Sequence, residues 1–297
     1  MSEHHSSDWL GLSGRVAVVT GGGGGIGRAT AVSFACAGVK VAALDRDERG
    51  LEETKARLRE FGDGHLVASC DTTSAESVAS AAATIERVLG PCAILVNAAA
   101  VLRPGGLDTL PLAEWNAVLA VNLTGYFICA QAFGRQMRQA GHGSIIHVAS
   151  IAASNAQEQS GAYSVSKAAV VMLSQQLAAE WGPHGIRSNV VSPGLVVTPM
   201  SQAFYDTPGV TERRSAAVPM RRIGAPQDMA DAILFLASDR SSYVNGGGDH
   251  RRWRLCADAD EPRSAAGVLN AAAQPSQQQP LTVKGPGAWP GRRRKLD

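Results

Sequence analysis

Short apolar runs recur along the chain, and longer amphipathic segments separate them. Six runs rich in β-branched and apolar residues predict buried strands over 15–20, 39–44, 65–70, 93–96, 144–149 and 186–191. The segments between them have helical spacing and predict helices over 28–37, 47–61, 74–89, 112–134, 160–181 and 226–237. Because strands alternate with helices, we expect an α/β fold with a doubly wound, mostly parallel sheet.

This pattern ends near Gly246. From Asp249 onward the chain is rich in Arg, Gln, Pro and Ala, and neither a helical nor a strand period persists. We therefore expect an atypical, disordered C-terminal tail. The sequence divides into a polar N-terminal extension over 1–11, a single domain over 12–247, and the tail over 248–297.

Composition narrows the class of protein. The chain has 297 residues, of which 45% are hydrophobic and 18% charged, and this suits one soluble α/β domain. A net charge of +2 gives no basic surface for nucleic acid. The chain shows neither a signal peptide nor about 18 uninterrupted apolar residues, so we expect a cytoplasmic protein without a membrane partner. The cysteines lack CxxC spacing, so we expect reduced side chains and no metal site at Cys36, Cys70, Cys92, Cys129 and Cys256.

A glycine-rich loop follows the first predicted strand and opens the first predicted helix. Residues 20–27 read Thr-Gly-Gly-Gly-Gly-Gly-Ile-Gly, and this position is typical of the dinucleotide-binding loop of a Rossmann fold. Without a Cβ, the backbone can turn sharply and approach a pyrophosphate, which the helix N–H groups then bind. The alternative is a flexible glycine-rich turn. We predict cofactor contacts at Gly21, Gly25, Ile26 and Gly27.

Acidic residues stand at the ends of the second and third predicted strands. A carboxylate at Asp45 can accept hydrogen bonds from the adenosine ribose and repel a 2′-phosphate, which favours NAD over NADP. The neighbouring Arg46 could instead accommodate that phosphate, and Asp45 could simply cap the following helix. Asp71 could bond the adenine amino group or only start a turn, and the sequence leaves both open.

A phenol and an ammonium group lie four residues apart at Tyr163 and Lys167, so on a helix they share one face. Tyrosine is a poor acid/base because its pKa is about 10, but a nearby cation lowers that pKa. Lys167 would therefore allow Tyr163 to exchange protons. Ser150 ends the preceding strand and can donate a hydrogen bond to a substrate oxygen. Taken alone, the pair also fits an ordinary exposed helix surface.

Together these motifs resemble the short-chain dehydrogenase/reductase family. The motifs that match in order and spacing are TGGGGGIG (20–27), Asp71, NAAA (97–100), Asn122 in VNLTG, Ser150, YSVSK (163–167) and PGLVVTPM (193–200). The resemblance implies hydride transfer between NAD(H) and a small secondary alcohol or ketone, with the chemistry supplied by the cofactor. It also implies a homotetramer. A reductase of 3-oxoacyl thioesters is a close variant, although Asp45 argues mildly against it.

The resemblance further implies roles for single residues. Tyr163 would be the acid/base, Ser150 would hold the substrate oxygen, and Lys167 would lower the pKa of Tyr163 and bind the nicotinamide ribose. Asn122 would hold a water that links Lys167 to solvent. The substrate pocket would form between residues 152–159 and 200–219. Thr198 would bond the nicotinamide carboxamide, and the other cofactor contacts would come from Asn97, Pro193 and Gly194.

Two departures from the family pattern stand out. Ala100 replaces a glycine of the usual NNAG motif, which is tolerated if its φ is negative. After Gly246 the family's last strand, similar to ITVDGG, is missing. Residues 248–254 read GDHRRWR, and codons for them shifted by one base encode Val-Ile-Thr-Val-Asp-Gly-Gly. We infer a frameshift near Gly247, with a genuine divergent extension as the alternative.

The lost strand would leave one edge of the sheet unpaired. We therefore expect lower stability and a disturbed tetramer. An impaired dinucleotide-binding protein is the remaining functional alternative.

Overall fold

A six-stranded parallel sheet in the order β3-β2-β1-β4-β5-β6 forms the centre of the computed structural model. The structure describes residues 8–247, so the predicted tail and its frameshift lie outside the described residues. The described residues belong to one compact unit. The strands are β1 (Val16–Thr20), β2 (Lys40–Asp45), β3 (Leu66–Ser69), β4 (Ile94–Asn97), β5 (Gly143–Val148) and β6 (Ile186–Val191).

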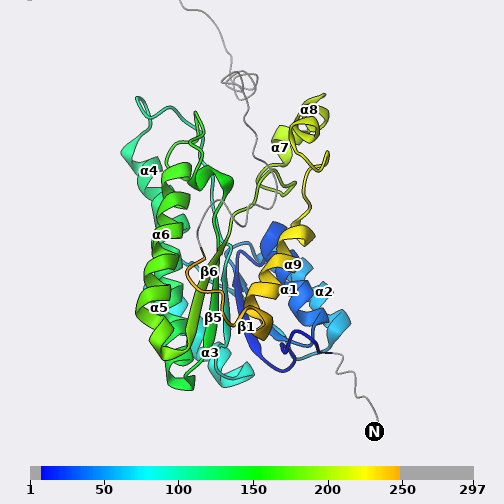
Figure 1. The fold of residues 1–297 in the computed structure, drawn as a ribbon, viewed down its shortest axis with the longest axis vertical. Coiled ribbons are helices and arrows are strands. Elements are labelled where there is room, and N and C mark those ends of the chain that lie inside the picture. The colour runs from blue at the N-terminus through cyan, green and yellow to red at the C-terminus, as the bar shows by residue number, and fades with distance from the viewer. Residues whose placement is uncertain (1–7, 248–297) are drawn as a thin grey trace, which may run out of the picture. The chain divides into compact units, whose positions relative to one another are not determined.

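Helices cover both faces of the sheet (Figure 1). One face carries α1 (Gly25–Cys36), α2 (Glu48–Leu58) and α9 (Pro226–Ala237). The other carries α3 (Ala75–Leu89), α5 (Gly125–Ala140) and α6 (Tyr163–Trp181). The strand order reverses between β1 and β4, and cofactors bind at such a switch point, beyond the carboxyl ends of the strands. The remaining helices are α4 (Leu112–Leu119), α7 (Gln202–Tyr205), α8 (Val210–Ala217), η1 (Arg59–Phe61), η2 (Ala120–Thr124), η3 (Ile151–Ala153), η4 (Gly182–His184) and η5 (Asp239–Ser241).

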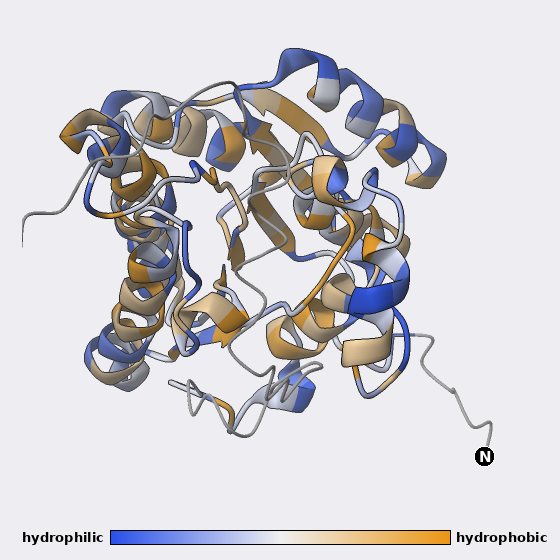
Figure 2. Ribbon diagram, turned by 90° about the horizontal axis from the view of Figure 1, so that it is seen from above, coloured by the Kyte–Doolittle hydropathy of each residue, from blue (hydrophilic) through white to orange (hydrophobic). Residues whose placement is uncertain are grey.

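Alternating side chains explain why the strands are buried on both sides. In β1, Ala17 and Val19 pack into the core beneath α1 and α9, whereas Val16 and Val18 pack into the core beneath α3 and α5. A strand that is covered on both faces reads as a continuous apolar run. Figure 2 shows this apolar character along the strands, with helices on either side. The predicted α/β fold and all six predicted strands are confirmed, with small shifts at their ends.

The predicted helix over 112–134 was wrong in its length and regularity. The structure has α4, then the π-helical turn η2, then α5, which ends before Gly141 in the left-handed region at φ 72°. By length and composition alone, Leu112–Ala140 could cross a membrane, but α5 packs in the core against α3 and β4. The stretch 200–219 also contains α7 and α8, which the sequence pattern did not predict.

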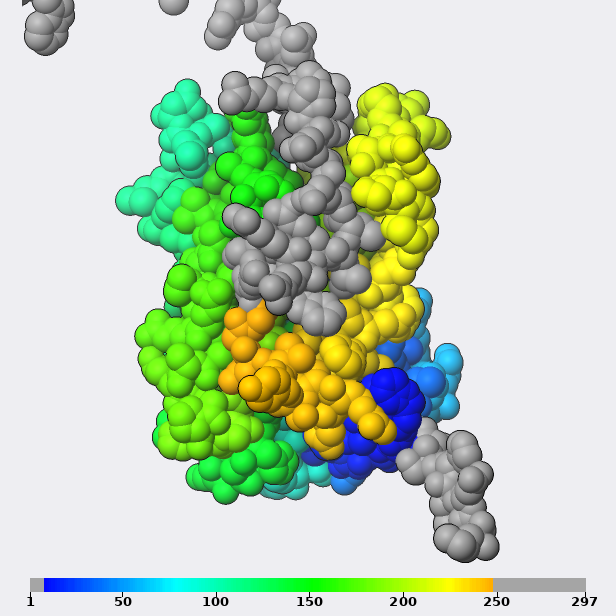
Figure 3. All heavy atoms as spheres, in the orientation of Figure 1, coloured from blue at the N-terminus to red at the C-terminus, as the bar shows by residue number. Residues whose placement is uncertain are grey.

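The last described residues run beside β6. Gly246 N–H donates to Ser188 O at 2.9 Å, and Ser188 N–H donates to Asn245 Oδ1 at 2.9 Å. Asn245 Nδ2 also donates to Ala178 O, which attaches this segment to α6. Figure 3 shows the end of the described chain, in orange, against the part of the chain drawn in green. Within residues 8–247, β6 pairs with β5 alone, so the described sheet ends at β6.

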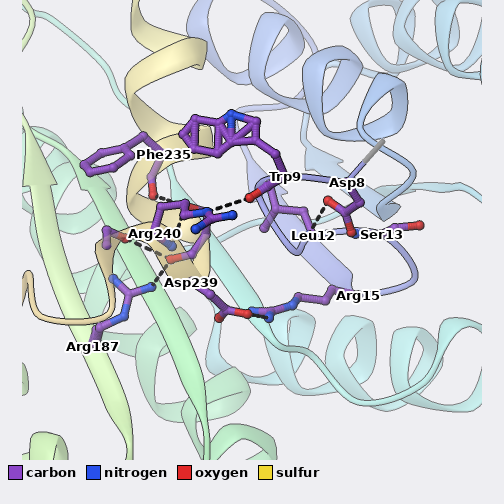
Figure 4. Close-up of polar contacts among 11 residues, drawn as sticks. Asp8, Trp9, Leu12, Ser13, Arg15, Arg187, Phe235, Asp239 and Arg240 are labelled. Carbon is purple, nitrogen blue, oxygen red and sulfur yellow. Dashed lines mark hydrogen bonds and ion pairs between the residues drawn. The ribbon is translucent and has the colours of Figure 1, made fainter. Parts of the chain in front are cut away.

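The beginning of the described chain packs against the segment after α9 (Figure 4). Asp8 accepts hydrogen bonds from the N–H groups of Leu12 and Ser13, which closes a tight turn. Arg240 Nε donates to Trp9 O at 2.7 Å, and its guanidinium lies 5.1 Å from the centroid of the Trp9 ring. Residues 8–11 of the predicted polar extension are therefore attached to the domain.

Candidate active site

The glycine loop after β1 forms a cradle that side chains would fill. Gly21 has φ +69°, and a Cβ there would lie 2.8 Å from the backbone of Ala98 and Ala99. A Cβ on Gly27 would lie 2.1 Å from Gly21 O. These contacts require glycine, and the loop leads into the amino end of α1 at Gly25, where free N–H groups attract phosphate. The predicted loop therefore has the shape that a dinucleotide requires.

Asp45 lies at the end of β2, against this loop. Gly23 N–H donates to Asp45 Oδ2 at 2.9 Å, and the N–H groups of Arg46 and Asp47 donate to Oδ1. The last two bonds close the turn before α2, and Asp47, the N-cap residue of that helix, makes no side-chain capping bond. The carboxylate is partly exposed and thus available to a ribose near the loop.

The side chain of Asp71 forms a turn, which was one of the two roles that the sequence left open; the other was a bond to adenine. Its Oδ1 accepts from the N–H of Thr73 at 2.9 Å and from the Thr73 hydroxyl at 2.8 Å. The Thr73 backbone bond is the main cause that lowers the pKa of Asp71. The other oxygen, Oδ2, lies 3.7 Å from Arg46 Nη1. The turn is confirmed, and a contact with adenine stays a prediction.

The loop after β6 lies beside the glycine loop. Thr198 and Pro199 are the nearest neighbours of Gly25, since a Cβ on that glycine would lie 3.5 Å from Thr198 Cβ. Pro193 O accepts from Ile151 N–H at 3.0 Å, which joins this loop to the residue after Ser150. Residues far apart in the sequence therefore surround one region at the carboxyl ends of the strands.

Ser150, Tyr163 and Lys167 meet in that region. Tyr163 is the first residue of α6, and Lys167 lies one turn later on the same face, with Nζ 5.7 Å from the centroid of the Tyr163 ring. Burial raises the pKa of Tyr163, and a side-chain hydrogen bond with Ser150 acts in the opposite direction. Ser150 Oγ also accepts from Ala152 N–H at 3.1 Å, so the short helix η3 orients its hydroxyl.

Lys167 is a deeply buried cation. Its side chain is 1% exposed, and burial lowers its pKa from 10.5 to about 7. Nζ donates to Val148 O at 2.8 Å and to the Tyr126 hydroxyl at 3.4 Å. The ammonium is thus placed inside the protein, beside the phenol that it was predicted to assist.

Asn122 is fully buried in the π-helical turn η2. Val101 N–H donates to its Oδ1 at 2.8 Å, and its Nδ2 donates to Val101 O at 3.0 Å and to Ser166 Oγ at 3.1 Å. Its carboxamide therefore joins the segment after β4 to α6. π-Helical turns occur often at functional sites, but the predicted relay water stays a prediction.

The side chain of Asn97 points into the interior, whereas the backbone of the alanines after it lies next to the glycine loop. The Asn97 side chain is fully buried, and its Nδ2 lies 3.4 Å from Tyr126 O and 3.2 Å from His147 Nδ1. Thr20 Oγ1 accepts from the N–H groups of Ala98 and Ala99, next to the glycine loop. Ala100 has no positive φ, so its backbone accommodates the methyl group, and the effect of that group on the cofactor contact stays a prediction.

Comparisons with known proteins agree with this geometry. A family model described as enoyl-(acyl carrier protein) reductase matches residues 21–248. D-threitol dehydrogenase of Mycolicibacterium smegmatis is 40% identical over 235 residues, covering 79% of this chain and 90% of that protein. The chain belongs to the short-chain dehydrogenase/reductase family.

Solved structures of the family share the fold. Gluconate 5-dehydrogenase from Burkholderia cenocepacia, in complex with NADP and tartrate, is 34% identical with a TM-score of 0.76, covering 80% of this chain and 94% of that one. NAD⁺-bound xylitol dehydrogenase is 32% identical with a TM-score of 0.74, covering 79% and 96%. This short-chain dehydrogenase/reductase is therefore an oxidoreductase that transfers hydride between a nicotinamide dinucleotide and a secondary alcohol or its ketone.

The sequence did not indicate the residues that hold the glycine loop and Lys167 in place. Arg28 donates to Gly23 O, to Gly50 O and to Thr54 Oγ1, and so attaches the glycine loop to α2. Tyr126 and His147 lie beneath Lys167. A signal was present for both: Tyr126 follows Asn122 by one helical turn, and His147 is a polar residue inside an apolar strand. Only the folded arrangement shows what they contact.

Among residues 8–247, no group of three or more His, Cys, Asp and Glu side chains is placed to hold a metal ion. Cys70, Cys92 and Cys129 are free and buried, as expected, whereas Cys36 is free and exposed. Cys256 lies outside the described residues.

Proposed function

We propose that this short-chain dehydrogenase/reductase is an NAD-dependent polyol dehydrogenase with Tyr163 as its acid/base. The observation that carries the proposal is the convergence of Ser150, Tyr163 and the buried Lys167 ammonium beside the glycine loop. A tyrosine serves as a general base only where its phenolate is stabilised, and Lys167 supplies a cation at that point.

In the oxidising direction, each residue has one task. The Ser150 hydroxyl donates a hydrogen bond to the substrate oxygen and orients it. The Tyr163 phenolate takes the hydroxyl proton as the carbonyl forms, and the Lys167 charge favours that phenolate. The bound nicotinamide supplies the hydride acceptor. In the reducing direction, Tyr163 returns the proton to the same oxygen.

The dinucleotide would lie across the carboxyl ends of β1 and β4. Its pyrophosphate would lie in the cradle at Gly21, Gly25, Ile26 and Gly27, where a Cβ added to any of the three glycines would clash or strain the backbone. The adenosine end would face Asp45 and Asp71. Its nicotinamide end would face Lys167 and the 193–198 loop, with contacts from Pro193, Gly194 and Thr198; Asn97 and Asn122 complete the predicted set.

The contacts of Asp45 support NAD as the preferred cofactor. Its carboxylate is held at the loop by three backbone N–H groups, which keeps a negative charge where a 2′-phosphate would sit. Arg46, the group that could accept that phosphate, lies instead toward Asp71. NADP use therefore requires Arg46 to leave Asp71 and offset the Asp45 charge.

A polyol substrate is supported by the relatives and by the loop after Ser150. D-threitol and xylitol dehydrogenases are among the similar proteins. Residues 154–159 read Ser-Asn-Ala-Gln-Glu-Gln and are all exposed, so their amide and hydroxyl groups are available to substrate hydroxyls. Gln157 is a candidate contact within this loop, with surface packing as the alternative.

The test is a panel of polyols, simple secondary alcohols and one 3-oxoacyl thioester, each assayed with NAD(H) and NADP(H). We expect polyol oxidation with NAD to be fastest. Tyr163→Phe lowers that rate by about 100-fold or more while NADH still binds, because only the proton exchange is lost. Tyr243→Phe is the matched control, since Tyr243 is fully exposed. Turnover unaffected by Tyr163→Phe would exclude the mechanism, and a preference for the thioester would exclude the substrate class.

The cytoplasmic location, the homotetramer and the lack of nucleic-acid or membrane partners stay predictions from the sequence. Light scattering on the purified chain measures its oligomeric state directly.

A further inference from the structure

Lys167 lies between two phenols, of which only Tyr163 has a part in the proposed reaction. Its Nζ is 5.7 Å from the centroid of the Tyr163 ring and 5.2 Å from the centroid of the Tyr126 ring. An ammonium group has three donors and no acceptor. Two donors are used, one on Val148 O at 2.8 Å and one on the Tyr126 hydroxyl at 3.4 Å. Tyr126 is therefore the side chain that holds the cation.

The Tyr126 hydroxyl is oriented to accept this bond. It donates its own proton to Val148 O at 3.2 Å, which leaves its lone pairs for Lys167 Nζ. The ring is 1% exposed and stacks on His147 with centroids 5.8 Å apart and planes 20° apart. Asn97 Nδ2 in turn contacts His147 Nδ1. A side chain fixed on both of its sides can hold a neighbour in one position.

We propose that Tyr126 is a positioning residue, whose hydroxyl holds the Lys167 ammonium beside Tyr163 and so sets the pH at which Tyr163 exchanges protons. The inference rests on the proposed roles of Tyr163 and Lys167. It adds a residue from α5 that touches neither the substrate nor the cofactor and acts through Lys167.

Few titratable groups face Lys167 from the surrounding elements. Tyr126 comes from α5 and His147 from β5, and burial keeps both uncharged by raising the pKa of Tyr126 and lowering that of His147 to about 3. Tyr163 comes from α6 itself. The η2 and η3 turns carry no ionisable side chain. The other charged groups on the elements that pack against α6 have partners of their own. Glu114 on α4 pairs with Arg103, and Arg187 on β6 donates to Leu236 O. His184 on η4 contacts Arg138, and Glu180 on α6 accepts from Gln176.

The Tyr126→Phe variant removes the acceptor and keeps the ring. The Lys167 ammonium then loses a hydrogen bond, so its charged form is less favoured and the pKa of Lys167 falls. With less positive charge nearby, the Tyr163 phenolate is less favoured and the pKa of Tyr163 rises. We expect the pH at which alcohol oxidation becomes half-maximal to move upward by about one unit, because a bond to a charged group is lost.

Two measurements on the full chain test this. The first is the pH profile of kcat/KM for oxidation of the best alcohol, for the wild type and for Tyr126→Phe. The second needs no turnover, because it follows the ultraviolet absorbance of phenolate as the pH is raised. The curve of Tyr163→Phe is subtracted from that of the wild type, and the curve of the double variant Tyr126→Phe/Tyr163→Phe from that of Tyr126→Phe, so that each difference reports Tyr163 alone. Both readouts should move to higher pH in Tyr126→Phe, with the limiting rate within about two-fold of the wild type.

Phe133→Leu is the matched control, because Phe133 is a fully buried aromatic on the same helix and packs in a separate part of the core. It should lower the unfolding temperature and leave both profiles in place. An unmoved Tyr163 titration in Tyr126→Phe, or an equal shift in Phe133→Leu, would overturn the inference. If Tyr163→Phe stays active, the proposed mechanism fails by itself, and the absorbance titration still decides whether Tyr126 acts on Tyr163.

Discussion

At the scale of single residues, the charge on buried Lys167 assists the proposed reaction but destabilises the folded protein. An ammonium that leaves water loses hydration, and two hydrogen bonds do not restore it fully. This is why burial lowers the pKa of Lys167 to about 7. The group that makes Tyr163 usable therefore weakens the fold.

Lys167→Met should abolish alcohol oxidation and raise the free energy of unfolding. Below pH 7 the lysine is charged in both the folded and the unfolded state, so the wild type bears the full penalty of burying the charge. Lys167→Met removes that penalty and should raise the free energy of unfolding by at least about 1 kcal/mol. Between pH 7 and 10.5 the coupled Lys167–Tyr163 pair holds one proton fewer in the folded than in the unfolded state, so the penalty falls as pH rises. Urea unfolding at pH 6 and pH 9 measures this, and a gain that grows toward pH 9 would contradict the sign.

Asp45 gives a second prediction at this scale. Asp45→Ser removes the carboxylate that would repel a 2′-phosphate, so the ratio of kcat/KM for NADP to that for NAD should rise by about ten-fold or more. Asp47→Ser is the control, because Asp47 is exposed two residues further along the same turn. An unchanged ratio in Asp45→Ser would show that another group selects the cofactor.

The sequence indicated the side chains that are proposed to react more clearly than the residues that support them. Ser150, Tyr163 and Lys167 were predictable because their spacing and order carry the chemistry. The carboxamide contacts of Asn122 and the position of Tyr126 were not, because they depend on how η2 packs against α6 and how α5 packs against β5. Hydrogen bonds across such interfaces leave no periodic trace in a sequence.

At the scale of elements, the π-helical turn η2 places Asn122 where it joins two segments. Its fully buried carboxamide satisfies both backbone groups of Val101, which is partly exposed. Asn122→Ala leaves these groups without a partner and should lower the free energy of unfolding by about 2–3 kcal/mol. Asn116→Ala, at an exposed position of α4, should change it by less than about 0.5 kcal/mol. Equal losses measured in urea would contradict this role.

The strands were the most predictable elements, because burial on both faces makes each one a short continuous apolar run. The interruption at η2 was not predictable, since residues 112–140 keep an apolar helical pattern throughout. The helices α7 and α8 were missed for the opposite reason: few of their side chains are buried, so little apolar period marks them.

At the scale of the whole molecule, the described sheet ends at β6, where Gly246 and Ser188 share one backbone bond. A chain that reads Val-Ile-Thr-Val-Asp-Gly-Gly after Gly247 should pair along that edge as a seventh strand. We expect it to melt several degrees higher than a chain ending at Gly247, and to form a larger assembly. Calorimetry and light scattering on both chains measure these properties. Equal melting temperatures would count against the frameshift hypothesis.

The contact between Trp9 and Arg240 brings the start of the domain next to the segment that follows its last helix. Neighbouring ends make a domain tolerant of circular permutation. A linker that spans from residue 247 to residue 8 could close the chain, and a new start at Asp63, in an exposed turn between two glycines, would leave every site residue in place. The catalytic domain could then be inserted into another protein through its α2–β3 turn.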